Sequence, residues 1–125
     1  MILKDSFFCV EQENERNGLP VFSIRLNPSH TIFKAHFPGS PIVPGVCQIQ
    51  ILSELMEMYS GRKLYLKEMK NIKFLSVLDP IQTPCLEVDF QKITIDMESL
   101  KTTALLQTAM KQYAKISLMY LFELI

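Results

Sequence analysis

The sequence HFPGSPIVPGVCQIQILSELMEMYSG, residues 36–61, decides how the chain is built. Its first eleven residues, His36 to Val46, contain one histidine, three prolines and two glycines. Proline fixes φ and glycine permits positive φ, so these residues predict a rigid and sharply bent loop. An imidazole on such a loop titrates near neutral pH, and the start of a helix favours negative charge. The stretch therefore predicts a base held beside an anion-stabilising site.

The second part of this stretch predicts an amphipathic helix over residues 44–60. Pro44 suits the first helical turn, and Gly61 is typical of a helix stop. Apolar residues recur at steps of three and four, which is the spacing of one helix face. They are Val46, Ile49, Leu52, Leu55, Met56 and Tyr59.

Most of the remaining sequence predicts β-strands. Two strands, 7–13 and 19–26, flank a turn signal at residues 14–18. Further strands are expected over 64–78, 86–95, 100–110 and 113–124. The apolar phase slips by one residue near Gln91 and Lys92, which predicts a β-bulge there. We expect one α+β domain over residues 1–125, with about six mostly antiparallel strands wrapped around one helix.

Composition excludes several classes of protein. Hydrophobic residues make up 48% of the chain, which supports a folded core, and 13 basic residues balance 13 acidic ones. This balance lacks the positive charge of a nucleic-acid binder. No apolar run is long enough for a membrane span, and the start of the chain lacks the features of a secretion signal. Three scattered cysteines and two histidines favour reduced thiols without a metal centre, so we expect a cytoplasmic protein.

The run His-Phe-Pro-Gly-x-Pro-x-x-Pro-Gly-Val over residues 36–46 resembles the hot-dog-fold 3-hydroxyacyl-acyl-carrier-protein dehydratases of fatty-acid synthesis. The similarity extends over nearly the whole chain, including residues 71–74 after the helix. It implies a hot-dog fold and a lyase that removes water from a 3-hydroxyacyl thioester to give a trans-2-enoyl thioester. It also implies a homodimer or larger assembly with composite sites, and a reaction without metal or redox cofactor.

The resemblance assigns roles to several residues of the loop and helix. His36 is expected to be the general base, and the N–H of Gly45 is expected to polarise the thioester carbonyl. A helix start favours the negative charge that grows on that oxygen, which agrees with this role. Substrate-binding positions are expected at Phe37, Pro38, Gly39, Pro44, Val46 and Cys47.

The acid of the family is where this sequence departs from it. Fourteen positions after His36, the residue is Gln50, which has no acidic proton, and Glu54 stands where the family usually has glutamine. Three interpretations follow. Glu54 reaches the substrate directly or through a water that Gln50 orients; or His36 performs both proton transfers at a lower rate; or the protein binds acyl chains without turning them over. General acid assistance typically contributes about 10²–10⁴ in rate.

Two further alternatives concern partners and chemistry. A basic cluster of Arg62, Lys63, Lys67, Lys70 and Lys73 would suit the acidic surface of an acyl carrier protein, or would be a solvated strand edge. Besides the dehydratase, the sequence allows a non-catalytic subunit that binds an acyl carrier, and an acyl thioesterase of the same fold. His30, beside a proline in a turn, is expected to have no catalytic role.

Overall fold

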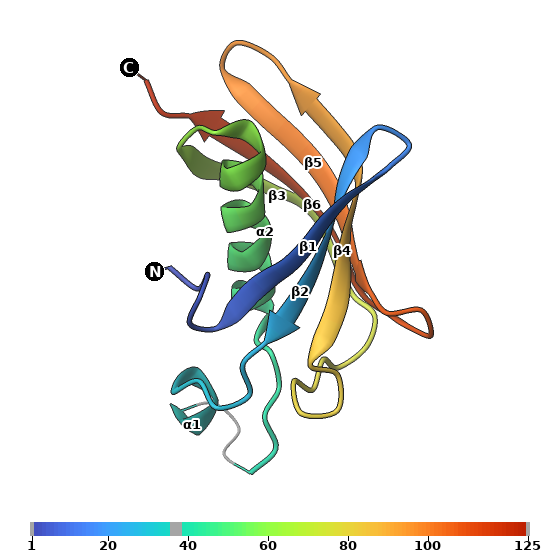
Figure 1. Ribbon diagram of the computed structural model, residues 1–125. Coiled ribbons are helices and arrows are strands. Elements are labelled where there is room, and N and C mark those ends of the chain that lie inside the picture. Colours follow the sequence, from blue (N-terminus) through green and yellow to red (C-terminus); the bar gives the residue numbers. More distant parts are fainter. Residues whose placement is uncertain (1, 36–38, 125) are drawn as a thin grey trace.

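The computed structural model describes residues 2–35 and 39–124 and forms one six-stranded sheet with a long helix against it (Figure 1). The strand order is β1-β2-β4-β5-β6-β3, and every pair is antiparallel. The expected hot-dog arrangement is therefore confirmed. The elements are β1 (Phe8–Arg16), β2 (Leu19–Leu26), α1 (Ile32–Ala35), α2 (Gly45–Ser60), β3 (Leu64–Phe74), β4 (Cys85–Ile95), β5 (Ser99–Gln107) and β6 (Gln112–Phe122).

Local sequence signals account for the shape of the sheet. Asn17 and Gly18 have φ of 54° and 80°, so they form the tight left-handed turn that joins β1 to β2. The register of β4 against β5 shifts between Phe90 and Lys92, which confirms the predicted bulge. The shift keeps apolar side chains on one face before and after it, since the side-chain period of a strand is two. β3 ends at Phe74 and not at residue 78 as expected.

Helix α2 lies along one face of the sheet (Figure 1). Gly61 caps its end, with φ of 68° and an N–H that donates to Glu57 O at 2.9 Å. Its buried face differs from the expected one. Val46 and Tyr59 are 69% and 41% exposed, whereas Ile51 is buried. The chain before β1 runs beside α2 and covers a second side of it, so spacing alone misplaced the buried stripe.

The core lies between α2 and the sheet. Leu52, Leu55 and Met56 of the helix have no exposed surface, and neither do Phe22, Phe90 and Tyr120 of the strands. The rings of Phe22 and Phe90 pack edge to face with centroids 5.9 Å apart. This rigid core fixes the position of α2, and thereby of every site residue that the helix carries.

The segment between β2 and α2 contains the short helix α1, which the sequence did not predict. Phe33 of α1 is buried and stacks on Phe7 at 5.2 Å. His30 lies in the turn before α1, where its Nδ1 accepts the N–H of Ile32 at 3.1 Å and its ring contacts Phe7. Neither helix of the described residues is long and apolar enough to cross a membrane.

Candidate functional site

The loop before α2 brings the chain to the start of the helix. His36, Phe37 and Pro38, the expected base and two expected substrate contacts, lie outside the described residues. Gly39 has φ of 85°, a conformation that glycine adopts without strain. Pro44 is extended, with φ −61° and ψ 149°, and its carbonyl accepts the N–H groups of Cys47 and Gln48. The N–H groups of the first helical residues have no acceptor within the helix, so they point out of its N-terminal end.

Gly45 occupies a position with little room for a side chain. A Cβ atom at this position would lie 2.6 Å from Cζ of Phe74, so any larger residue would displace that ring. Gly45 and Phe74 line a hollow of about 340 Å³, which we call the Gly45 hollow. Gln48 also lines this hollow. Gln48 is only 3% exposed, and its Oε1 has no hydrogen-bond partner among the described residues. The helix start thus combines backbone donors with one buried acceptor.

Gln50 and Glu54, where the sequence departs from the dehydratase pattern, contact each other. Nε2 of Gln50 donates to Oε2 of Glu54 at 2.8 Å. Residues four apart face the same side of a helix, which explains the contact. Glu54 is only 7% exposed, so a carboxylate at this position needs hydrogen-bond donors to offset the loss of water.

The segment before β1 supplies those donors. The N–H of Leu3 donates to Oε2 of Glu54 at 2.8 Å, and the N–H of Lys4 donates to Oε1 at 2.7 Å. Leu3 is buried, so this segment is packed as well as hydrogen-bonded. Glu54 therefore receives three N–H donors and ties α2 to the beginning of the chain.

A second hollow, of about 490 Å³, lies between α2 and β3, and we call it the α2–β3 hollow. Half of its ten lining residues are apolar and the other half carry a polar or charged group, so it combines both kinds of surface found in small-molecule sites. Gln50 and Val46 line it, whereas Glu54 does not. Its lining is Val46, Ile49, Gln50, Ser53, Glu57, Lys63, Leu64, Leu66, Met69 and Tyr120.

Cys47 and Glu57 lie on the same helix but in different surroundings. Cys47 is buried, and burial raises the pKa of its thiol, so the side chain is an apolar wall at neutral pH. Glu57 accepts the N–H of Leu64 at 2.9 Å and lies 3.8 Å from Nζ of Lys63. The carboxylate of Glu57 thus anchors the start of β3.

The five residues of the basic cluster lie on β3 or just before it and differ in their contacts. The guanidinium of Arg62 lies over the ring of Phe122 at 3.7 Å, and Lys63 pairs with Glu57. Lys70 lies 3.8 Å from Glu68, and Lys73 faces Lys115 of β6. Lys67 is exposed on β3. All five basic residues are nevertheless exposed, so the contacts of Arg62, Lys63 and Lys70 leave these side chains open to solvent.

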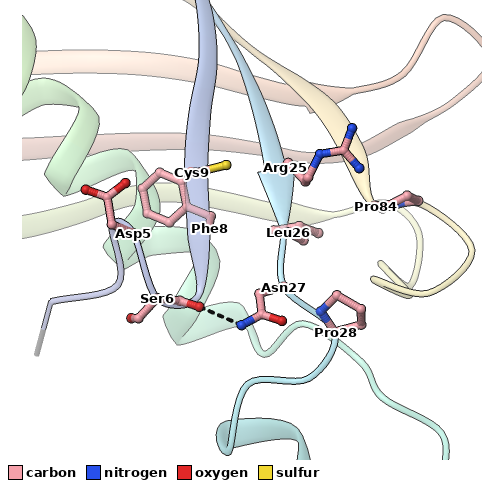
Figure 2. A pocket seen from close by; sticks show the side chains of 9 residues that line it. All are labelled: Asp5, Ser6, Phe8, Cys9, Arg25, Leu26, Asn27, Pro28 and Pro84. Atoms are coloured by element: carbon pink, nitrogen blue, oxygen red, sulfur yellow. Dashed lines mark hydrogen bonds between the residues drawn. The ribbon is translucent and has the colours of Figure 1, made fainter.

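A further hollow of about 520 Å³ lies where β1 begins and β2 ends (Figure 2). Asp5, Cys9, Arg25 and Asn27 line it, and Nδ2 of Asn27 donates to the carbonyl of Ser6 at 2.9 Å. None of the predicted site residues described by the structure lines this hollow. It is separate from the candidate site on α2.

Sequence reasoning missed three features of the site. Leu3 and Lys4 act through backbone N–H groups, which leave no mark in the residue types. Phe74 belongs to an expected strand, but nothing in the sequence indicated its contact with Gly45. The spacing of Gln48 from Pro44 is an ordinary helical turn, so only the structure reveals that its amide is buried.

Comparisons with known proteins agree with this geometry. Residues 11–114 match the family model of the ApeI-like proteins, described as ApeI dehydratase. A 3-hydroxyacyl-[acyl-carrier-protein] dehydratase FabZ of Clostridium acetobutylicum is 36% identical over 69 residues, which are 50% of this chain and 49% of that protein. The FabZ of Levilactobacillus brevis is 34% identical over 79 residues, 58% of this chain and 53% of that one. The chain thus spans about half the length of the curated relatives it matches.

Solved structures with this fold include the dehydratase heterocomplex ApeI:P from Xenorhabdus doucetiae. That chain is 19% identical with a TM-score of 0.66, and the match covers 90% of this chain and 96% of that one. The BH2602 protein from Bacillus halodurans, solved with CoA, is 12% identical with a TM-score of 0.60, and the match covers 91% and 74% of the two chains. These likenesses establish the fold, and the family model extends over most of the sequence, so the chain belongs to the ApeI-like family of hot-dog dehydratases.

Proposed function

We propose that this protein is a lyase that removes water from a 3-hydroxyacyl thioester and releases a trans-2-enoyl thioester. The observation that carries the proposal is the start of α2, where Gly45 lies beside a hollow directly after the His36 loop. Membership of the ApeI-like family supports the reaction class. The pathway would be fatty-acid or related acyl-chain biosynthesis in the cytoplasm.

The proposed chemistry assigns the first steps to His36 and Gly45. The imidazole of His36 would take a proton from C2 of the substrate, and negative charge would grow on the thioester oxygen. The N–H of Gly45, at the positive end of α2, would stabilise that charge. The C3–O bond then breaks and the C2–C3 double bond forms, and His36 gives the proton that it took from C2 to the departing hydroxyl, which leaves as water. The pair Gln50 and Glu54 would serve the hydroxyl side of this reaction.

The substrate would be carried by an acyl carrier protein, with its chain in the α2–β3 hollow. The apolar residues of this hollow, among them Val46, Ile49 and Met69, would contact the acyl chain. Phe37, Pro38, Gly39 and Pro44 would shape the entry, and Cys47 would support the wall from beneath. Arg62, Lys63, Lys67, Lys70 and Lys73 would form the docking surface, since all five are exposed.

The experiment is turnover of a 3-hydroxyacyl-carrier substrate, followed by mass spectrometry of the enoyl product. We expect His36→Ala to abolish turnover, because the base is lost. The matched control is Met110→Ala, since Met110 is 93% exposed in the turn between β5 and β6. Equal turnover by the His36→Ala variant would refute the proposal. Release of a free thiol in place of enoyl product would assign a thioesterase.

A second candidate is a non-catalytic subunit that binds an acyl carrier and assembles with an active relative. Gln50 favours it, because an amide cannot supply the acidic proton. The neighbour from Xenorhabdus doucetiae is described as a heterocomplex, which supports testing this assembly. If the chain alone is silent and Gln50→Glu restores turnover, this second function replaces the first.

A further inference from the structure

The sheet has an outer face, which points away from α2 (Figure 1). Leu118 of β6 has no exposed surface and belongs to the core, so the preceding residue, Ser117, points to the outer face. Ser117 is paired with Asn71 of β3 on one side and with Thr103 of β5 on the other. Thr103 is paired in turn with Lys92 of β4. Paired residues of neighbouring strands share a face, so these four residues form one row across the outer face.

A hollow of about 500 Å³ has all four residues of this row in its lining, and we call it the outer hollow. Its volume falls within the range of sites that bind small molecules. Three exposed lysines line it, Lys70, Lys92 and Lys101, and none of the described residues in its lining is acidic. The outer hollow is therefore a positively charged site, separate from the two hollows beside α2.

The charges of two of these lysines are not neutralised by a neighbouring carboxylate. Among the described residues, neither Lys92 nor Lys101 forms an ion pair. The charge of Lys101 also reaches Asp96 in the turn after β4, but that carboxylate is already held by three hydrogen bonds within the turn. Lys70 lies 3.8 Å from Glu68 of its own strand, and both side chains remain about half exposed. All three lysines can therefore meet an anion from solvent.

The floor of the outer hollow also offers a hydroxyl proton. Oγ1 of Thr103 and Oγ of Ser117 lie 2.9 Å apart, and both residues are half-buried. One hydroxyl donates to the other, so the accepting hydroxyl keeps its own proton. Neither side chain has another hydrogen-bond partner in the described part of the chain. A donor flanked by lysines favours a ligand atom that carries negative charge and accepts hydrogen bonds, as a phosphate oxygen does.

We infer that the outer hollow binds an anion with two linked phosphate groups. Lys70 of β3 and Lys92 of β4 stand three strand spacings apart, which is about 14 Å between their backbones. A single phosphate held by the Thr103 and Ser117 hydroxyls would leave one end of the hollow empty, whereas two linked groups contact the hydroxyls and lysines together. The ligand is a free diphosphate or the diphosphate of a nucleotide. The site lies on the face opposite to α2, so the inference does not depend on the proposed lyase activity.

The experiment is titration calorimetry of the unaltered protein with inorganic diphosphate, inorganic phosphate and ADP at low ionic strength. We expect saturable binding of diphosphate at one site per chain. Diphosphate should bind at least about tenfold more tightly than phosphate, because each added hydrogen bond to a charged group changes the dissociation constant by that much or more. Added salt should weaken the binding, since the lysines are exposed.

Two double variants assign the binding to the outer hollow. Lys92→Gln with Lys101→Gln should raise the dissociation constant of diphosphate at least about tenfold. Thr103→Val with Ser117→Ala removes both hydroxyls and should raise it at least about threefold.

The matched control is Lys34→Gln with Lys111→Gln. Both of these lysines are exposed and neither lines the outer hollow, so the control removes the same net charge elsewhere on the chain. It should change the dissociation constant less than about twofold. A control that weakens binding as much as the change at residues 92 and 101 would show attraction to net charge alone and would overturn the inference.

The remaining outcomes are as definite. Absence of saturable diphosphate binding overturns the inference, and phosphate that binds as tightly as diphosphate overturns the requirement for two linked groups. Tighter binding of ADP than of diphosphate supports the site and identifies a nucleotide, and equal binding supports it and identifies the diphosphate alone. Amide chemical shifts of the unaltered protein give a test that needs no variant. Changes on adding diphosphate should centre on residues 92–94, 101–103 and 117, and changes centred on α2 would contradict the site.

Discussion

The hydroxyl of Ser53 fixes the direction of a partly buried hydrogen bond at the α2–β3 hollow. Ser53 Oγ donates to the carbonyl of Ile49 at 3.1 Å, so Tyr120 is the donor in its 3.0 Å contact with Ser53. Burial raises the pKa of Tyr120, and its proton is therefore present at neutral pH. Ser53→Ala leaves this buried O–H without its acceptor and should lower the free energy of unfolding by about 1–3 kcal/mol. Tyr120→Phe should cost about 1 kcal/mol, and urea unfolding measures both.

The prediction is tested by which of the two substitutions lowers the free energy of unfolding more. Tyr120→Phe removes a donor, and Ser53 keeps its bond to Ile49. This costs less than Ser53→Ala, which leaves the buried hydroxyl of Tyr120 without an acceptor. Ser117→Ala serves as the control, because Ser117 and Thr103 share a 2.9 Å hydroxyl contact but are both half-buried, where water can replace the lost group. A greater loss for Tyr120→Phe than for Ser53→Ala would show that the bond runs the other way.

At the scale of elements, the turn between β4 and β5 should make stability depend on acid pH. Asp96 accepts the N–H groups of Glu98 and Ser99 and the hydroxyl of Ser99, and these bonds lower the pKa of its carboxyl. A lowered pKa in the folded state means that the stabilisation is complete above the unfolded value, 3.8, and is lost as pH falls through the folded value. Asp96→Ala should therefore be less stable than the unaltered protein at neutral pH, and the difference should shrink below about pH 3.8 in urea titrations. A difference that stayed constant down to pH 2 would contradict the role of the ionised carboxyl.

The elements themselves show what the sequence can and cannot predict. The strands, the bulge in β4 and the span of α2 follow from alternation, phase and capping residues, which are local. The buried side of α2 does not, because the segment before β1 covers residues such as Glu54 that look solvent-facing from spacing alone. The departure at residue 50 is visible in the sequence, but the backbone donors to Glu54 are not, because Leu3 and Lys4 lie 51 and 50 positions before it.

For the whole molecule, β3 is an edge strand with an unusual amount of apolar exposure. Leu66 and Met69 of β3 are 43% and 57% exposed. Their partners on β6, Tyr120 and Leu118, are buried on the α2 side of the sheet. Phe74 is 52% exposed on the same strand, and Val46 is 69% exposed on the facing helix. Edge strands and apolar patches of this kind are where other chains pair. They agree with the prediction of a homodimer or larger assembly.

We therefore expect Met69→Glu to weaken self-association. A second hot-dog chain over β3 would bury residue 69, and a carboxylate buried there without a donor should raise the dissociation constant at least about tenfold. Sedimentation over a range of protein concentrations measures this constant. Met110→Glu is the control, because Met110 is equally apolar and 93% exposed, but lies in the β5–β6 turn away from β3. Association weakened by the Met110 change and not by the Met69 change would place the interface elsewhere, and the α2–β3 hollow would then have to be complete within a single chain.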